Sequence, residues 1–430
     1  MKKVLIVIPL DGDFRRDPAN LLPLGPLSLE AYCRDLAEFK LVNMNAHRLR
    51  SPMMGEDSLY SSYLPEWDPD LIGVSSSFDF GFDSAVKLKR ALHSKYRGTP
   101  VVIGGHMTTF RWEELLKAGF DACCVGEGES ALRDLLMTRK FDHPQWKTEL
   151  ERGPEVVPWN KNSGNFFHHE VRPDDIPPYD FGAYDVPVGD SLPINLSTGC
   201  VGSCYFCTVS VNRSKRNRHR GIIRTMDDLT EYNRKWGVTK FFAVDDCPFE
   251  DRAYYRSVLK FIRDNGWKVH LFNVPLFNLE EEDCELISSV SVYDNVGISP
   301  DASCERVFRN VGKRGEWSDV KRVTDWFHKY GMKVLIVILV GYPFELRREI
   351  EGVVDEFSSV GADFYRVNIV QPLWGSDFYA EMSPFERPEM MTHDFLYKMV
   401  CQVDGSDWDR RWLEGIVPEL ERELNRKNPG

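Results

Sequence analysis

The chain has 430 residues, 42% hydrophobic and 12% aromatic, which predicts two or three globular domains and excludes a disordered protein. Its 66 acidic residues outnumber 54 basic ones, which argues against a dedicated nucleic-acid or anionic-membrane binder because phosphate contacts need a basic surface. No apolar run approaches the roughly 18–20 residues of a membrane helix. The first apolar run, 4–10, leads into charged residues instead of a signal cleavage site. We therefore expect a cytoplasmic protein whose ten cysteines serve metal binding or burial.

The first 145 residues alternate short apolar runs with amphipathic stretches. Strands are predicted at 4–9, 41–44, 71–75 and 100–104, and helices at 27–36 and 84–95. This alternation predicts a Rossmann-like, doubly wound parallel sheet, which binds ligands at the carboxyl ends of its strands. Three loops in this region are small or glycine-rich, so their backbone can approach a large flat ligand closely. They are Ser75-Ser76-Ser77, Gly104-Gly105-His106 and Gly126-Glu127-Gly128-Glu129.

A proline-rich linker without sustained periodicity is predicted over 146–190. Strand-helix alternation then resumes over 191–382. Strands are expected at 192–197, 240–244, 268–272, 292–298, 333–340 and 364–369, with helices at 226–236, 251–264, 279–289, 317–330 and 346–359. Six such units fit a partial barrel as well as an open sheet. Residues 383–430 are predicted to form a short helical cap.

Three cysteines with the spacing C-x3-C-x2-C follow the first strand of this second region: Cys200, Cys204 and Cys207. Three thiolates this close together in the sequence favour binding of zinc or of an iron–sulfur cluster. Structural zinc normally takes four protein ligands, and no second C-x2-C or H-x3-H pair supplies a fourth. Three ligands would leave one iron of a [4Fe–4S] cluster open for another molecule.

The cysteine motif, with Phe206 as its aromatic residue, resembles the signature of radical S-adenosylmethionine (SAM) enzymes. Further segments resemble this family in the same order, at 244–249, 297–301, 340–343 and 371–376. The resemblance implies a partial (β/α)6 barrel of the TIM type, in which the three cysteines hold a [4Fe–4S] cluster and the fourth iron binds SAM. Reductive cleavage of SAM would then give a 5′-deoxyadenosyl radical. The implied SAM contacts are Phe206, Arg220, Arg224, Asp245, Asp246, Ser299, Gly341 and Pro343.

The second region departs from the family pattern at Ser299, which stands where the family has a glutamate. That SAM contact is therefore lost or supplied elsewhere, for example by Asp301. A basic run over 212–220 is either a solvated loop or a clamp for an anionic group. Cys247 follows the acidic pair at 245–246, where a thiol can deliver a hydrogen atom or a proton. Most of the other cysteines are expected to be small buried hydrophobic residues.

Four segments of the first region resemble the cobalamin-binding domain that precedes one large class of radical SAM enzymes. The implied cobalamin contacts are Leu24, Gly25, Ser75, Ser76, Ser77, Gly104, Gly105, His106, Gly126, Glu127, Gly128 and Glu129. No D-x-H-x-x-G motif occurs in the chain, so cobalamin would lack the lower histidine ligand of mutase-type domains. We expect His106 to form its loop and not to bind cobalt.

The two resemblances favour a cobalamin-dependent methyltransferase that acts on an unactivated carbon of a small molecule or peptide, in natural-product biosynthesis for example. SAM would serve twice, as methyl donor and as radical source, and the family implies a flavodoxin or ferredoxin as reductant. The alternative is a non-methylating radical SAM enzyme, such as a dehydratase, epimerase, oxidase or rearrangement enzyme, whose first domain is a scaffold. A cobalamin-binding sensor and a structural zinc protein are more distant alternatives, since neither needs a low-potential cluster.

Overall fold

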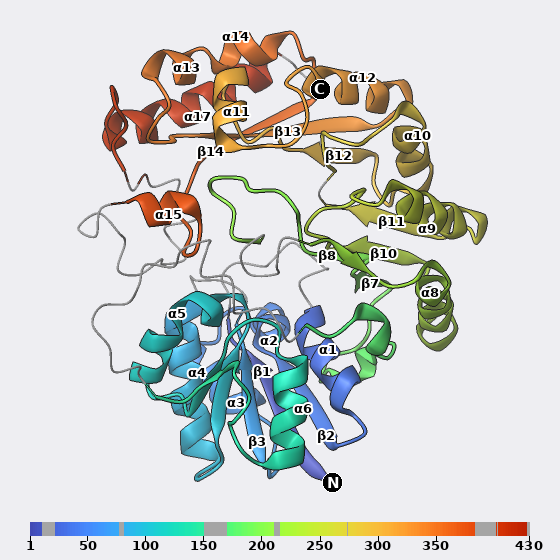
Figure 1. Cartoon of the computed structure of the whole chain (residues 1–430), viewed down its shortest axis with the longest axis vertical. Helices are drawn as coiled ribbons and strands as arrows, with labels where there is room; N and C mark the ends of the chain where they lie inside the picture. Colours follow the sequence, from blue (N-terminus) through green and yellow to red (C-terminus); the bar gives the residue numbers. More distant parts are fainter. Residues whose placement is uncertain are drawn as a thin grey trace. The chain divides into compact units, whose positions relative to one another are not determined.

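The computed structural model describes residues 1–10, 22–76, 81–149, 170–209, 216–272, 274–382, 401 and 403–427. These residues form two compact units, one up to Pro193 and the other from Ile194 onward. Each unit has its own sheets and covering helices (Figure 1).

The first unit is built on a six-stranded sheet with the order β2-β1-β3-β4-β5-β6. Its strands are β1 (Lys2–Ile8), β2 (Ala37–Asn43), β3 (Leu71–Ser75), β4 (Val101–Gly104), β5 (Ala122–Cys124) and β6 (Trp146–Lys147). The first five strands pair in parallel, and only the short β6 pairs in the antiparallel sense. This order is that of a doubly wound sheet, so the loops after β1, β3, β4 and β5 meet at one edge.

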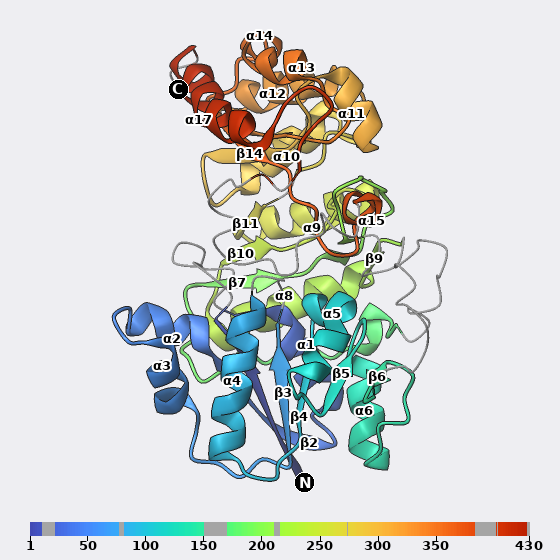
Figure 2. The same ribbon diagram turned by 90° about the vertical axis from the view of Figure 1, so that its left-hand side faces the viewer.

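Helices cover both faces of this sheet, as Figure 2 shows. They are α1 (Leu24–Cys33), α2 (Met44–Arg50), α3 (Glu56–Tyr63), α4 (Phe82–Lys95), α5 (His106–Lys117) and α6 (Glu129–Thr138). Helices α3, α4 and α5 contribute Tyr60, Leu88 and Leu115 to a core that includes Leu5 and Ile72 of the sheet. Helices α1 and α6 pack against each other. The apolar strands predicted in this region are therefore present and buried.

Part of the predicted proline-rich linker is integrated into the first unit. Its described residues form two short 3-10 turns, η3 (Pro173–Asp175) and η4 (Phe181–Ala183). Tyr184 then pairs with Leu41 as an isolated parallel bridge. The Tyr184 hydroxyl donates to the carbonyl of Pro23 at 2.6 Å. This segment thus fixes the residues in front of α1.

The second unit contains six main strands in two three-stranded sheets, β7-β10-β11 and β12-β13-β14. They are β7 (Ser191–Ile194), β10 (Lys240–Ala243), β11 (Lys268–Leu271), β12 (Asn295–Ile298), β13 (Lys333–Val340) and β14 (Phe364–Ile369). An isolated parallel bridge pairs Val274, which follows β11 in the chain, with Ile298 of β12. An antiparallel ribbon, β8 (Ser197–Thr198) with β9 (Arg218–His219), follows β7. The strands follow the predicted order of an open, partial barrel.

Helices alternate with these strands. They are α8 (Ile222–Trp236), α9 (Arg252–Asp264), α10 (Glu281–Val290), α11 (Glu305–Val311), α12 (Asp319–Lys329), α13 (Arg347–Glu351), α14 (Val353–Ser358), α15 (Asp377–Glu381) and α17 (Arg410–Lys427). The helix predicted at 346–359 is present as two consecutive helices, because α13 ends at Glu351 and α14 begins at Val353, with Gly352 between them. Sequence analysis also missed α11, which is only two turns long.

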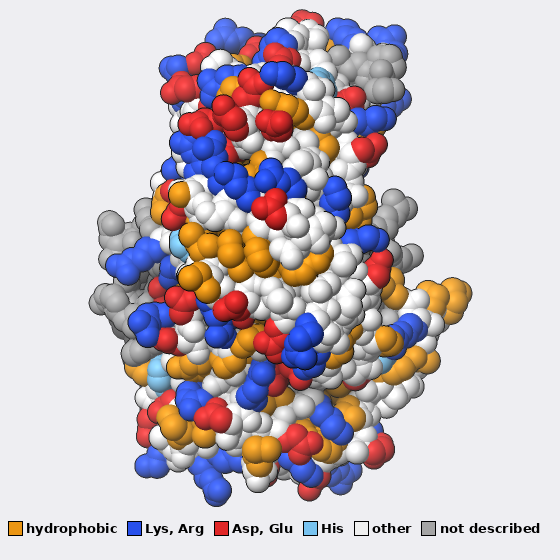
Figure 3. Space-filling view, turned by 90° about the vertical axis from the view of Figure 1, so that its right-hand side faces the viewer, with side chains coloured by type: hydrophobic (Ala, Val, Ile, Leu, Met, Phe, Trp, Pro, Cys, Tyr) orange, Lys and Arg blue, Asp and Glu red, His pale blue; other side chains and the backbone are white. Residues whose placement is uncertain are grey.

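The outer helices of the second unit carry interspersed charges (Figure 3). For example, Arg252 and Arg256 of α9 form ion pairs with Glu280 in front of α10. No helix in the described part of the chain has both the length and the apolar character needed to cross a bilayer.

Candidate functional site

The three motif cysteines lie on the loop that follows β8, and all three are partly buried. Backbone N–H groups donate to two of their sulfurs: Gly202 to Cys200 at 3.3 Å and Val209 to Cys207 at 3.5 Å. The N–H of Cys207 donates to the carbonyl of Cys204 at 3.0 Å. N–H groups directed at sulfur favour the thiolate form that a metal cluster requires.

Two carboxylates anchor the backbone in front of this loop. Asp245 accepts from the N–H groups of Leu196 at 2.7 Å and Ser197 at 2.9 Å, and Asp246 accepts from that of Gly199 at 2.8 Å. Burial raises the pKa of Asp245 to about 7, although the hydrogen bonds from the backbone oppose that shift. The hydrogen bonds that Asp245 and Asp246 accept in the structure fix the start of the cysteine loop. Their contact with SAM stays a prediction.

Cys247 lies beside Cys200, and the two thiols share a hydrogen bond that lowers the pKa of Cys200 and raises that of Cys247. The Sγ atom of Cys247 is also 3.6 Å from Oε2 of Glu250. The Cys247 thiol thus has two neighbours, the thiol of Cys200 and the carboxylate of Glu250. Its predicted transfer of a hydrogen atom or proton to a substrate stays a prediction.

A segment that sequence analysis missed, Gly312-Lys313-Arg314, lies directly against the cysteine loop. The Tyr205 N–H donates to the Val311 carbonyl at 2.8 Å, and Cys204 Sγ is 3.9 Å from the Gly312 carbonyl oxygen. Lys313 and Arg314 form ion pairs on either side, with Asp301 and Glu250 respectively. No motif marks these residues, because their partners are up to about a hundred positions away in sequence.

The two arginines predicted to contact SAM both lie against the Asp228 carboxylate. Arg220 reaches it at 2.6 Å and Arg224 at 3.2 Å, and Arg220 and Asp228 are buried. Burial raises the pKa of Asp228, whereas the two guanidinium groups act against this rise. Their predicted role at SAM remains untested. The first four residues of the basic run, 212–215, lie outside the described residues.

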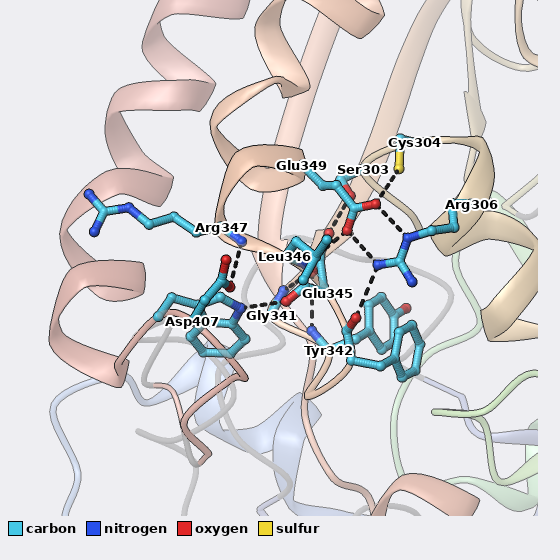
Figure 4. Close-up of polar contacts among 12 residues, drawn as sticks. Ser303, Cys304, Arg306, Gly341, Tyr342, Glu345, Leu346, Arg347, Glu349 and Asp407 are labelled. Carbon is cyan, nitrogen blue, oxygen red and sulfur yellow. Dashed lines mark hydrogen bonds and ion pairs between the residues drawn. The ribbon is translucent and has the colours of Figure 1, made fainter.

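The turn that contains Gly341 and Pro343 is held by a buried carboxylate, Glu345 (Figure 4). Glu345 accepts from the N–H of Gly341 at 2.6 Å and of Tyr342 at 3.2 Å, and from the hydroxyl of Ser303. Burial raises the pKa of Glu345 to about 7, while these hydrogen bonds lower it. Sequence analysis overlooked Glu345, although an acidic residue two positions after the proline of a G-x-P turn is a readable signal for such a brace.

Aromatic rings support the same turn and the cysteine loop. The Tyr205 ring stacks on Phe378 with centroids 5.4 Å apart, and the Phe206 and Tyr342 centroids are 6.3 Å apart. The Tyr342 hydroxyl donates to the Asp301 carbonyl at 2.9 Å. Ser299 is partly buried directly after β12. The residues predicted to surround SAM thus come from five separate segments of this unit.

The donor chemistry of this loop fits a [4Fe–4S] cluster. Each cysteine ligand of such a cluster binds a different iron, so the sulfurs surround the cluster instead of one metal ion. Within the described ranges, no three His, Cys, Asp or Glu side chains are grouped as a single-ion site would require. Three cysteine thiols on one loop are the donor set of such a cluster, with one iron left open.

In the first unit, the predicted cobalamin loops meet at the carboxyl edge of the sheet. The Ser76 N–H donates to the Gly104 carbonyl at 3.0 Å, which ties the loop after β3 to the end of β4. Gly105 has φ +110°, and a Cβ there would lie 2.1 Å from the Ser76 carbonyl oxygen. His106 begins α5, and its ring packs 5.3 Å from that of Phe110. Ser77 lies outside the described residues.

The 126–129 loop is fixed by three side chains. The Gly126 N–H donates to Thr109 Oγ1 at 3.1 Å, and the Ser28 hydroxyl donates to Glu129 at 2.6 Å. Gln145, which sequence analysis missed, donates to the carbonyl of Glu127. A Cβ on Gly128 would lie 3.3 Å from Leu29, so this loop packs tightly on α1.

Helix α1 begins with Leu24 and Gly25, and nothing lies within 4 Å of the position of a Cβ on Gly25. Gly25 is exposed and leaves backbone uncovered at the start of α1, whereas the space that a Cβ of Gly105 would take is filled by Ser76. Uncovered backbone at this edge suits the close approach of a large flat ring such as a corrin.

Comparisons with known proteins agree with this geometry. Residues 18–136 match the B12 binding domain family, and residues 194–357 match the radical SAM superfamily. An uncharacterized methyltransferase of Pyrococcus horikoshii is 22% identical over 405 residues, covering 87% of this chain and 82% of that protein. The cytidylyl-2-hydroxyethylphosphonate methyltransferase of Streptomyces wedmorensis is 22% identical over 487 residues, covering 99% of this chain and 90% of that protein.

The fold is similar to that of the radical SAM methyltransferase TsrM from Kitasatospora setae, whose structure holds cobalamin and a [4Fe–4S] cluster. The two structures superpose with a TM-score of 0.67 at 18% identity, covering 88% of this chain and 77% of TsrM. Both the predicted order of the two regions and the predicted α/β class are thereby confirmed. Residues 194–357 thus belong to the radical SAM superfamily, and residues 18–136, in front of them, belong to the B12 binding domain family.

Proposed function

We propose that the chain is a cobalamin-dependent methyltransferase that acts on an unactivated carbon of a small molecule or peptide. The observation that carries this proposal is that one chain holds two sites. One is the anchored three-cysteine loop of the radical SAM domain, and the other is the sheet edge of the B12 binding domain, where backbone is uncovered at Gly25. Relatives named as methyltransferases along nearly the whole chain support the methyl-transfer outcome.

The residues of the chain would hold and orient the cofactors. Bound together, the cluster, SAM and cobalamin would supply a 5′-deoxyadenosyl radical and a methyl carrier. Cys200, Cys204 and Cys207 would each bind one iron, while Asp246 holds their loop through Gly199. The turn braced by Glu345 would line the adenine of SAM, with Phe206 beside it. We expect a flavodoxin or ferredoxin as reductant and a cytoplasmic location, which the ten free cysteines support.

The first test is the cofactor content of the full chain, purified anaerobically from cells supplied with hydroxocobalamin. We expect about four irons, four sulfides and one corrin per chain. Incubation with SAM and a chemical reductant is then expected to yield S-adenosylhomocysteine as well as 5′-deoxyadenosine. A Cys204→Ala variant should lose 5′-deoxyadenosine formation, and a Cys284→Ala variant, altered at a buried cysteine of α10, should retain it.

Two outcomes would overturn methyl transfer. Formation of 5′-deoxyadenosine without S-adenosylhomocysteine from a chain that holds corrin would indicate a non-methylating radical enzyme. Corrin without iron would indicate a cobalamin sensor, because neither product would form.

A further inference from the structure

We infer that Lys313 and Arg314 are positioning residues that set the reduction potential of the iron–sulfur cluster. They would do so as two cations held against the cysteine loop by the segment Gly312-Lys313-Arg314. This inference rests on the proposed cluster site and not on methyl transfer.

The segment is attached to the cysteine loop by its backbone. The Val311 carbonyl accepts from Tyr205, and the Gly312 carbonyl lies 3.9 Å from Cys204 Sγ. Gly312 ends α11 with φ +74°, and a Cβ there would approach the Ser203 carbonyl oxygen to 3.2 Å. The left-handed turn directs the next two residues along the cysteine loop, and a larger side chain at 312 would push the two segments apart.

Lys313 lies next to the part of the loop that holds Cys204. It directly follows Gly312, whose carbonyl oxygen is 3.9 Å from Cys204 Sγ, and its ammonium forms an ion pair with Asp301. Asp301 is also buried, and its ion pair fixes the ammonium in place.

Arg314 lies next to the part of the loop that holds Cys200. Its Cδ lies 3.8 Å from the position of a Cβ on Gly202, which in turn would be 3.2 Å from Cys200 Sγ. The guanidinium is paired with Glu250 and packs 3.8 Å from the centre of the Phe277 ring. The segment thus brings one cation to the Cys204 side of the loop and one to the Cys200 side, and each cation has one carboxylate partner.

Positive charge beside a cluster favours the state that has gained an electron, since the added negative charge is stabilised. Removing a cation should make the cluster harder to reduce, and removing its carboxylate partner should make it easier. The two substitutions in each pair therefore have opposite expected signs. A residue that only supports the loop would not produce that pattern.

The test is a redox titration of the reconstituted full chain, followed by electron paramagnetic resonance without SAM or substrate. We expect a more negative midpoint potential for Lys313→Met and Arg314→Gln, and a more positive one for Asp301→Asn and Glu250→Gln. Lys321→Met, an exposed lysine of α12, is the control and should not shift the potential. Because Arg314 is 36% exposed, its shift should shrink at high salt more than that of Lys313.

The inference would be overturned if variants that hold the cluster kept the wild-type midpoint potential. It would also be overturned if the cation variant and the carboxylate variant of one pair shifted the potential in the same direction. If Lys313→Met fails to hold iron, the Arg314 and Glu250 pair decides the question, because the Arg314 guanidinium stays charged when its partner is removed in Glu250→Gln. A wild-type chain that binds no iron would instead overturn the proposed function itself.

Discussion

At the scale of single residues, Gly105 is required by the backbone of its neighbour. Its φ of +110° and ψ of −178° are a conformation almost confined to glycine, and a Cβ would lie 2.1 Å from Ser76 O. We expect Gly105→Ala to destabilise the first unit by about 2 kcal/mol or more. Hydrogen exchange of the amides in β3 and β4 measures this unit separately.

The matched control is Gly98→Ala, where φ is +83° but nothing lies within 4 Å of the new Cβ. Only backbone strain acts there, so we expect a loss of about 1 kcal/mol. Equal losses at the two positions would show that the contact with Ser76 is not what requires a glycine at 105.

Glu345 makes the stability of the second unit depend on pH. Its pKa is raised from 4.5 to about 7, mainly by burial, so the folded chain binds its proton where the unfolded chain has released it. The free energy of unfolding should therefore fall as pH rises from about 4.5 to 7, by about 3 kcal/mol at most. Asp245, with its pKa raised to about 7, contributes in the same direction.

Glu345→Gln should flatten this pH profile, because a glutamine does not titrate and its carbonyl can still accept from Gly341. Midpoints of urea unfolding at pH 5 and pH 7.5 give the comparison for wild type and variant. Glu282→Gln, at an exposed position of α10, should keep the wild-type profile. An unchanged slope in Glu345→Gln would mean that this carboxyl group is ionised throughout the range.

At the scale of elements, α17 protects the edge strand β14. Asn425 accepts from the Tyr365 N–H at 2.9 Å and donates to the Tyr365 carbonyl at 3.0 Å, as a neighbouring strand would. Glu421 accepts from the Val367 N–H at 2.9 Å. Side chains of a helix thus replace the missing strand and block pairing with another chain.

Asn425→Ala should leave both backbone groups of Tyr365 without their partner, at a cost of about 1–3 kcal/mol. We expect the Tyr365 amide to exchange roughly 5- to 150-fold faster with solvent. Arg426→Ala, which removes an exposed side chain of the same helix, should leave that rate unchanged. Similar rates in all three proteins would show that packing of α17, and not Asn425, protects the edge.

The apolar strands and amphipathic helices were predictable because they depend on local periodicity. The cysteine motif was equally readable, since all three ligands lie within eight residues. Lys313 and Gln145 could not be predicted in this way, because each lies against a loop that is distant in the sequence and close only in the folded chain. Arg220 is the opposite case, in which the sequence position suggests contact with a ligand. In the structure its guanidinium forms an ion pair with Asp228. Local pattern therefore identifies ligands more readily than the residues that position them.

At the scale of the whole molecule, the chain places its two expected cofactor sites in units with separate sheets and cores. The corrin edge is fixed by bonds within the first unit, such as Ser28 to Glu129. The cysteine loop is fixed within the second, by Asp246 and by the carbonyls of Val311 and Gly312. Because no described anchor is shared, loss of one cofactor should not remove the other.

Cys204→Ala tests this independence, because it removes one cluster ligand without touching the first unit. We expect iron to fall far below four per chain while corrin stays near one, measured on the same anaerobic preparation by iron assay and absorbance. Cys284→Ala removes a fully buried thiol of α10 and should retain both cofactors. Parallel loss of corrin and iron in Cys204→Ala alone would mean that cobalamin is held only when the cluster is present, and the two sites would then have to be treated as one.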